Sequence, residues 1–245
     1  MQFTAKQAAA RAARSPTSTS NLLRRLLQAG LVDRVRRGRY AIRPLGSLGT
    51  TVAAESILLA VAAGFPGLAH RVAYRSALDH HELLVHPSRS IQVALAKPTR
   101  SEILSGRPLI TVLEPKAVLS IGAERHGDAS VSDLERALLD AAARPELVGG
   151  IAILAEALSA AATQVDPERL RIYAEGLRWG AAFRRIGSIA DALVLHGLAG
   201  KLSPLVEPTS DIDLEPGRHE STWRDSKWRI RWDQAPEQLA NVVHA

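Results

Sequence analysis

The first 30 residues show two runs with a helical spacing of apolar and polar positions. Residues 4–13 contain strong helix formers after a threonine that suits an N-cap, which predicts a first helix. Ser15 and Pro16 then supply an N-cap and a first helical residue, and Gly30 supplies a C-terminal stop. The pattern therefore predicts a second helix over 16–29, joined to the first by a short turn.

The second predicted helix has two different faces. At about 100° per residue, its four leucines fall on one arc with Thr19 beside them, which indicates the side that packs on a core. The opposite side carries residue types that hydrogen-bond to base edges and phosphates. Its members are Thr17, Ser18, Asn21, Arg24, Arg25 and Gln28. We predict that this side contacts DNA, against the alternative that it is the ordinary polar face of a surface helix.

Two β-prone runs follow this helix, over 31–36 and 39–42. They are joined around Gly38, where glycine permits the positive φ of a tight hairpin. A basic hairpin directly after a helix pair is the wing of a winged helix-turn-helix domain. Its arginines are predicted to neutralise DNA phosphates, although a solvated run of charge is the alternative. They are Arg34, Arg36, Arg37 and Arg39.

The charge of the chain is concentrated at its amino terminus. Residues 1–43 hold ten basic residues and one acidic residue, a net charge of +9, whereas the remainder holds 21 basic and 24 acidic residues, a net charge of −3. A bias of the genome toward GC-rich codons explains arginine in place of lysine, but it does not explain this position. The distribution is typical of a nucleic-acid-binding module attached to a different kind of domain.

A segment rich in proline, glycine and serine over 44–50 marks a predicted domain boundary. The predicted domains are a winged helix-turn-helix over 1–46 and a larger domain over 51–245. A winged helix usually has one more helix before the helix pair. Either residues 51–63 supply that helix or the true start of the protein lies upstream of Met1.

The rest of the chain mixes strand and helix patterns, so the predicted fold class is α+β. Strands are predicted over 90–97, over 109–113 and around Ile121. A capping box, Ser132-Asp133-Leu134-Glu135, opens a helix that stops near Arg144-Pro145. Further helices are predicted over 151–162, 166–177 and 181–195, followed by two closing strands. In the last strand Trp228, Ile230 and Trp232 share one face, which indicates a half-buried strand in preference to single-strand stacking.

Composition excludes several classes of protein. The chain has no cysteine, so disulfides and Cys-ligated metals are excluded, which fits a reducing interior. No apolar stretch reaches the roughly 20 residues that span a bilayer, and the start lacks the apolar core of a signal peptide. We therefore expect a cytoplasmic protein with no membrane contact.

Several stretches resemble the AbiEi-type antitoxins of type IV toxin–antitoxin systems. They are residues 131–151, 177–194 and 214–233, together with residues 30–40 of the predicted winged helix and the region around 76–78. The resemblance implies a bacterial transcriptional repressor that binds repeated sites in double-stranded DNA of its own promoter. It also implies that the larger domain counteracts a toxin similar to nucleotidyltransferases (AbiEii-like), encoded beside it. It implies neither an enzyme nor a cofactor.

Two arginine clusters are candidates for a contact with that toxin or for an extension of the DNA footprint. Arg136 and Arg144 lie with Asp140 on the polar side of the helix that the capping box opens. Arg178, Arg184 and Arg185 form the second cluster. The alternative is that both are ion pairs on a wet surface.

Two further clusters are weaker candidates for metal sites. Asp79, His80, His81, Glu82 and His86 match no standard ligand spacing, and loop-capping histidines are commoner. Asp211, Asp213 and Glu215 alternate as in a metal-dependent nuclease, but prolines bracket them in what reads as a polar loop. We predict no metal site and an antitoxin that represses its own operon. The alternatives are a stand-alone regulator with a ligand-sensing domain and, resting on the acidic cluster alone, a nuclease.

Overall fold

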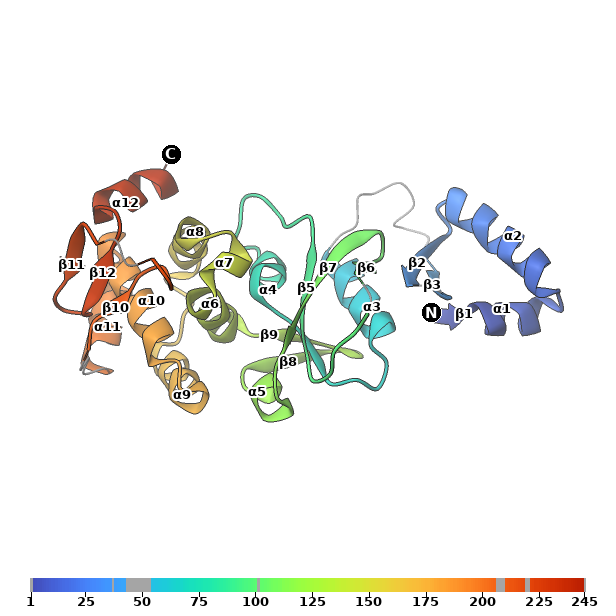
Figure 1. The fold of residues 1–245 in the computed structure, drawn as a ribbon, viewed down its shortest axis with the longest axis horizontal. Coiled ribbons are helices and arrows are strands. Elements are labelled where there is room, and N and C mark those ends of the chain that lie inside the picture. The colour runs from blue at the N-terminus through green and yellow to red at the C-terminus, as the bar shows by residue number, and fades with distance from the viewer. Residues whose placement is uncertain are drawn as a thin grey trace. The chain divides into compact units, whose positions relative to one another are not determined.

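The computed structural model describes residues 2–36, 38–42, 54–100, 102–205, 210–218 and 221–244. Helices and several sheets make up a mixed α+β fold, as predicted (Figure 1). The chain divides into two compact units. The amino-terminal unit contains residues 1–72, 89–114 and 125–130, and the carboxy-terminal unit contains residues 73–88, 115–124 and 131–245. The predicted boundary at 44–50 lies outside the described residues.

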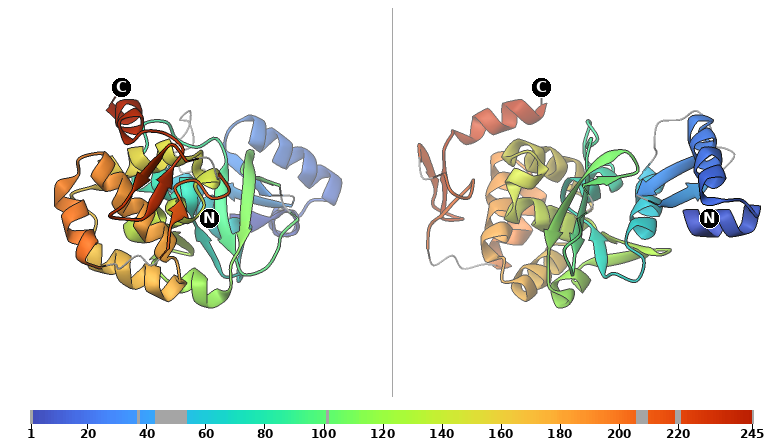
Figure 2. Two further views of the ribbon diagram at one scale, coloured as in Figure 1. Left: turned by 60° about the vertical axis from the view of Figure 1, so that its left-hand side comes forward. Right: turned by 45° about the vertical axis from the view of Figure 1, so that its right-hand side comes forward.

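The first 42 residues form two helices and three short strands. The order is β1 (Gln2–Thr4), α1 (Ala5–Ala12), α2 (Pro16–Gln28), β2 (Val32–Arg36) and β3 (Arg39–Ile42). Both predicted helices and both strands of the predicted hairpin are confirmed, and the arrangement fits a winged helix-turn-helix (Figure 2). The predictions missed β1, which pairs antiparallel with β3 and stacks Phe3 on Tyr40 with ring centroids 5.8 Å apart.

The remainder of the amino-terminal unit is built on a six-stranded sheet with the order β6-β7-β5-β4-β9-β8. The strands are β4 (His70–Val72), β5 (Ile91–Leu95), β6 (Ile103–Leu104), β7 (Arg107–Leu113), β8 (Ala123–His126) and β9 (Ala129–Ser132), and residues 125–130 of the β8–β9 hairpin belong to this unit. The strands predicted over 90–97 and 109–113 are confirmed as β5 and β7, which run parallel. The strand predicted around Ile121 is wrong, because this residue lies in the turn before β8.

Helix α3 (Ala54–Gly64) follows the linker and packs against β2, β3 and β6 within the same unit. It covers much of the segment that was expected as a third helix for the winged domain. Arg71 of β4 and Glu114, the residue after β7, form a buried ion pair at 2.8 Å.

The carboxy-terminal unit is a group of helices with a small sheet on one side (Figure 2). Its helices are α4 (Tyr74–His80), α5 (Lys116–Ser120), α6 (Leu134–Ala143), α7 (Pro145–Val148), α8 (Ile151–Ala161), α9 (Pro167–Leu177), α10 (Gly180–Ala192), α11 (His196–Leu202), a 3-10 turn (Ser203–Leu205) and α12 (Pro236–His244). The sheet has the order β10-β12-β11, with β10 (Ile212–Asp213), β11 (Trp223–Asp225) and β12 (Ile230–Trp232). Helix α10 contacts α6, α8, α9, α11 and α12, so it is the centre of this unit.

Helix α6 begins one residue later than the predicted capping box places it. Its N-cap is Asp133, whose carboxylate accepts a hydrogen bond from the Arg136 amide. Ser132 is the last residue of β9, and its hydroxyl donates to Asp140 at 3.1 Å. The predicted end of the helix before Arg144-Pro145 is confirmed.

Arg136 is not on a surface, which corrects its prediction as a contact residue. It is 0% exposed, and its Nε donates to Asp140 Oδ1 at 2.7 Å. Its Nη1 donates to two backbone carbonyls of the α5 region, at 2.9 Å each, and its guanidinium lies 4.9 Å from the Trp179 ring centroid. The predicted i,i+4 pair exists, but it is buried inside the unit.

Arg184 and Arg185 of α10 are corrected in the same way, because each is only 7% exposed. Arg184 donates to the carbonyls of Ser210, Trp228 and Arg229, and Arg185 donates to those of Ala142 and Asp213. These bonds tie the small sheet to α10. Arg144 and Arg178 are exposed, with Arg144 paired to Glu146, and their contact with a partner stays a prediction.

The last strand is buried on one face, as the alternating pattern predicts. Ile230 and Trp232 of β12 are at most 1% exposed, and so is Trp228, which lies in the turn before β12 and not in the predicted strand. Gly187 of α10 lies under Trp228, and a Cβ there would be 2.3 Å from the indole ring, so only glycine permits this approach. The predictions missed α12, which follows the sheet and packs on α8 and α10.

We predict that Asp140→Ala destabilises the protein by about 3 to 5 kcal/mol, because it leaves the Arg136 guanidinium buried without its carboxylate. Urea denaturation followed by circular dichroism measures the change. Removing both partners, in Arg136→Met with Asp140→Ala, should cost less than the sum of the two single changes. The solvent-accessible pair of half-buried Arg171 and exposed Glu175 on α9 is the control, and Glu175→Ala should have a far smaller effect. Equal losses of stability in Asp140→Ala and Glu175→Ala would contradict the assignment of Arg136 and Asp140 as a buried ion pair that the fold requires.

Candidate nucleic-acid interface

Local side-chain hydrogen bonds cap the starts of the two amino-terminal helices. Thr4 and Gln7 form a reciprocal capping box at the start of α1. At the start of α2, the Ser15 hydroxyl accepts from the Ser18 amide at 3.3 Å, and Pro16 occupies the first helical position. Gly30 follows α2 with φ of +66°, the left-handed conformation expected of a C-terminal glycine. The predicted caps of both helices are confirmed.

Helix α2 packs one face inward and leaves the other exposed. Leu23 and Thr19 are each 2% exposed, and the Thr19 hydroxyl donates to the Ser15 carbonyl at 2.9 Å. The opposite face carries the six residues that were predicted to address DNA. Thr17, Asn21, Arg24, Arg25 and Gln28 are exposed and Ser18 is half-buried. The structure thus brings these side chains onto one accessible surface, and their contact with DNA stays a prediction.

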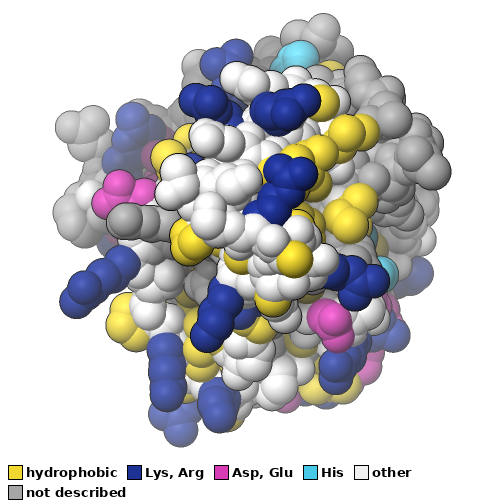
Figure 3. All heavy atoms as spheres, turned by 90° about the vertical axis from the view of Figure 1, so that its right-hand side faces the viewer, with side chains coloured by type: hydrophobic (Ala, Val, Ile, Leu, Met, Phe, Trp, Pro, Cys, Tyr) yellow, Lys and Arg dark blue, Asp and Glu magenta, His cyan; other side chains and the backbone are white. Residues whose placement is uncertain are grey.

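The electrostatics of this surface favour an anion. Neither α1 nor α2 has an acidic residue in its first turn, where the partial positive charge of a helix lies. Lys6, Arg11 and Arg14 are exposed as well, although the sequence singled them out only through their charge. Figure 3 shows that Lys and Arg predominate among the charged side chains on this end of the molecule. These three residues extend the candidate surface.

The predicted wing corresponds to the β2–β3 hairpin. Gly38 at its turn has φ of +77°, and the register shifts between Arg34 and Arg36. Arg34 is exposed, Arg36 is the last residue of β2, and Arg37 lies outside the described residues. The hairpin therefore has the predicted turn and an irregularity at its basic end.

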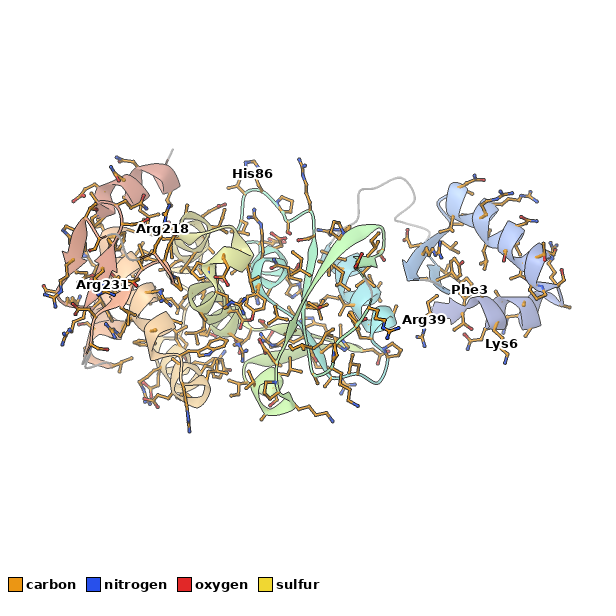
Figure 4. All side chains as sticks on the ribbon, in the orientation of Figure 1. Phe3, Lys6, Arg39, His86, Arg218 and Arg231 are labelled. Atoms are coloured by element: carbon orange, nitrogen blue, oxygen red, sulfur yellow. The ribbon has the colours of Figure 1, made fainter. Side chains whose placement is uncertain are left out.

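Arg39 differs from the other wing arginines because it is engaged within the unit. It is half-buried, and its Nη1 donates to the Ala63 carbonyl in the last turn of α3 at 3.4 Å. Figure 4 shows the side chain extending toward α3. A cation at a helix C-terminus is favourable, so Arg39 links the wing to α3. Its predicted phosphate contact stays a prediction.

The carboxylates of the predicted acidic cluster form ion pairs with arginines. Asp211 Oδ1 accepts from Arg224 at 3.0 Å and from Arg229 at 2.8 Å, and these hydrogen bonds lower the pKa of Asp211 to about 2. Asp213 pairs with Arg231 at 2.7 Å, and Glu215 pairs with Arg218. Carboxylates held this way favour a structural role over a nuclease site.

Members of the predicted histidine cluster also form hydrogen bonds within the protein. A ring nitrogen of His81 lies 2.7 Å from the Ser132 carbonyl, and Asp79 accepts from the Ser88 amide at 2.7 Å. In the part of the chain that the structure describes, no three His, Asp or Glu side chains form a metal-ligating group. No described helix is long and apolar enough to cross a membrane.

Comparison with known proteins identifies the amino-terminal segment. Residues 2–43 match the family model described as "Transcriptional regulator, AbiEi antitoxin". The predicted family resemblance is thereby confirmed over the winged segment, and this family is one of regulators and not of enzymes. No curated protein matches the chain.

A solved structure shares the fold of the chain. It is the crystal structure of the RV2827C protein from Mycobacterium tuberculosis, with 18% sequence identity and a TM-score of 0.70. The similarity covers 100% of this chain and 90% of that chain. At this identity the likeness shows a shared fold.

We predict that Ser15→Ala weakens α2 by about 1 kcal/mol, because the change removes the hydroxyl that caps the helix. Amide hydrogen exchange along α2 measures the loss as faster exchange in its first turns. Ser20→Ala, at an exposed position inside the same helix, is the matched control and should leave exchange unchanged or slower. Unchanged exchange in Ser15→Ala would show that the cap does not hold the helix.

Proposed function

We propose that this protein is the antitoxin of a type IV toxin–antitoxin system and that it represses its own operon by binding repeated sites in the promoter. The observation that carries the proposal is the exposed polar face of α2 within the segment that matches the regulator family. The proposal places the protein in the bacterial cytoplasm.

In the DNA-binding half of the proposal, the side chains of the surface are assigned to bases or to phosphates according to their hydrogen-bonding groups. Asn21 and Gln28 present amides suited to adenine, and Arg24 presents a guanidinium suited to guanine. Thr17 and Ser18 lie in the first turn of α2, where hydroxyls and backbone amides hold a phosphate. The α2 face therefore reads bases in the major groove, and the wing holds the flanking backbone.

The antitoxin half rests on the family described for residues 2–43. The larger part of the chain has a net charge unlike that of the winged segment, which fits a separate task. In this proposal that task is to counteract a nucleotidyltransferase-like toxin encoded by the adjacent gene. The reaction of the toxin is not performed by this chain.

One structural feature favours the second candidate, a stand-alone regulator with a ligand-sensing domain. The carboxy-terminal unit has an open hollow of about 540 Å³ between the α8–α9 and α10–α11 connections. Thr163, His196 and Lys201 are the polar side chains among its lining residues. A small molecule that binds this hollow and changes promoter affinity, with no toxic gene adjacent, would favour this candidate over the antitoxin.

We predict a graded response of DNA affinity to substitutions on the two surfaces. Asn21→Ala or Arg24→Ala should cost about 1 to 3 kcal/mol and relax sequence preference, because each removes a base contact. Arg34→Gln, Arg36→Gln or Arg37→Gln should weaken all sequences alike and flatten the dependence on salt. Gel shifts on the protein's own upstream region and on a scrambled duplex measure both effects.

The control for these substitutions is Arg171→Gln, which removes the charge of a half-buried arginine on α9, outside the winged segment. It should leave the affinity for both duplexes unchanged. A uniform loss for Asn21→Ala, equal on specific and scrambled DNA, would contradict its assignment to base reading.

Co-expression with the adjacent gene tests the antitoxin half. We expect the neighbour alone to arrest growth and the pair to grow, because this chain counteracts the toxin. Variants that lose promoter affinity should still rescue when both genes are driven by foreign promoters. A neighbour that is not toxic, or whose toxicity is unchanged, would refute the antitoxin function.

A further inference from the structure

The hollow between the α8–α9 and α10–α11 connections contains polar side chains that the fold itself does not use. Its polar lining residues are Thr163, His196 and Lys201, and all three are exposed. No residue in the described part of the chain forms a hydrogen bond or an ion pair with their side chains. By contrast, Arg171 and Arg218 of the same unit pair with carboxylates of the protein. The polar groups of the hollow are therefore free to bind a ligand.

The charge of the hollow favours an anion. Among its described lining residues Lys201 carries the one full charge, and none is acidic. The carboxylates nearest to the lining residues in the sequence are engaged elsewhere. Asp166 accepts from two backbone amides of α9 at 3.0 and 3.1 Å, and Glu168 and Asp191 each pair with a basic side chain. One cation without a carboxylate matches a ligand with one negative charge.

The remaining lining residues are mostly apolar. Val165 and Leu198 are buried, and Pro167 and Leu195 are half-buried. Small-molecule sites typically combine apolar walls with a few polar groups, in a volume of about 300 to 1,000 Å³. The hollow has this composition and a volume of about 540 Å³. Its ligand is therefore expected to carry an apolar body beside the charged group.

Val194 lines the hollow in a strained backbone conformation. Its φ is +58°, in the left-handed region that β-branched residues rarely adopt. The Val194 amide donates to the Asp191 carbonyl at 3.0 Å, and the Leu195 amide donates to the Ala190 carbonyl at 2.8 Å. This pair of bonds is the Schellman motif, in which the left-handed position is usually glycine. Val194 is 62% exposed, so burial in the core does not offset its strain. Strained residues cluster at ligand sites, which favours a contact between Val194 and a ligand.

We propose that this hollow binds a small organic carboxylate with an apolar body. Lys201 binds the carboxylate, and Thr163 and His196 form hydrogen bonds beside it. Val194 and Val165 contact the apolar body. This inference goes beyond the proposed function, because the site requires neither DNA nor a toxin.

The lining favours a carboxylate over a phosphate ester. A phosphate group carries a charge of about −1.5 to −2 at neutral pH and has three acceptor oxygens. Phosphate sites commonly supply arginines, whose paired N–H groups match these oxygens. No arginine is among the described lining residues, and Lys201 alone does not balance a doubly charged group.

The test uses the purified full chain and four probes, which are hexanoate, benzoate, hexanamide and inorganic phosphate. Titrations followed by amide NMR measure both the affinity and the place of binding. We expect the two carboxylates to saturate a site whose shifts centre on residues 163, 196 and 201. Hexanamide should bind about tenfold more weakly than hexanoate, because it keeps the apolar body and lacks the charge. Phosphate should bind more weakly than either carboxylate, because it has no apolar body.

We expect Lys201→Gln to weaken hexanoate binding by about tenfold, because it removes a hydrogen bond between charged groups. The affinity for hexanamide should stay unchanged. Lys116→Gln is the matched control, because Lys116 is an exposed lysine on a helix of the same unit and does not line the hollow. It should retain the affinity for hexanoate.

We expect Val194→Gly to have opposite effects on stability and on binding. Glycine adopts the left-handed conformation without strain, so the midpoint of thermal unfolding should rise by about 2 °C. Loss of the isopropyl group should weaken hexanoate binding by about threefold or more. Since the variant is more stable than wild type, unfolding cannot cause this loss.

Several outcomes would overturn the inference. They are that neither carboxylate binds, that the shifts lie away from the hollow, or that Lys201→Gln binds hexanoate as tightly as wild type. Equal affinity for hexanamide and hexanoate, or tighter binding of phosphate than of both carboxylates, would overturn it as well. If Val194→Gly is stabilised and binds hexanoate unchanged, the ligand contact of Val194 is wrong. Growth rescue tests the antitoxin proposal without any of these probes, so either proposal can fail while the other stands.

Discussion

Buried guanidiniums on two neighbouring helices impose a constraint on the whole carboxy-terminal unit. A charge taken out of water must find a hydrogen-bond acceptor for each of its donors, or it destabilises the fold. Arg136 of α6 donates to Asp140 and to carbonyls around α5, and Arg184 and Arg185 of α10 donate to backbone carbonyls of the small sheet and its turns. These bonds join the α5 region to α6 and the small sheet to α10.

Charge is used in opposite ways in the two parts of the chain. In residues 2–42 the basic side chains are mostly exposed on short helices and a hairpin whose own core is small, with Leu23 and Val32 as its buried apolar side chains among those described. In the carboxy-terminal unit most of the described arginines are either buried or paired with carboxylates, and Arg178 is an exposed exception. A surface on which exposed cations predominate favours a polyanion such as DNA. The proposed assignment of promoter binding to the amino-terminal segment rests on this difference.

Local signals allowed the amino-terminal elements to be predicted closely. Thr4, Ser15, Pro16 and Gly30 act within a few residues of themselves, so their sequence context determines the caps that the structure shows. The alternation of Trp228, Ile230 and Trp232 likewise identified a buried face.

Features that depend on distant partners were missed or misplaced. Strand β1 exists because it pairs with β3, and Arg136, Arg184 and Arg185 are buried because acceptors from other segments surround them. A helical projection that counts arginine as polar assigns such residues to the surface. The exposed polar face of α2 was predictable from the sequence, whereas the engagement of Arg39 with α3 depends on a segment 24 residues away.

The central claim is that the exposed face of α2 reads the bases of the operon's own promoter. Photo-crosslinking tests it most directly, with a photoreactive residue placed at position 21 in one protein and at position 231 in another, each mixed with the upstream duplex. The account predicts that position 21 forms crosslinks to bases at discrete, repeated sites and that position 231 forms none to DNA. Crosslinks from position 231 alone, or crosslinks from position 21 spread evenly along any duplex, would contradict it.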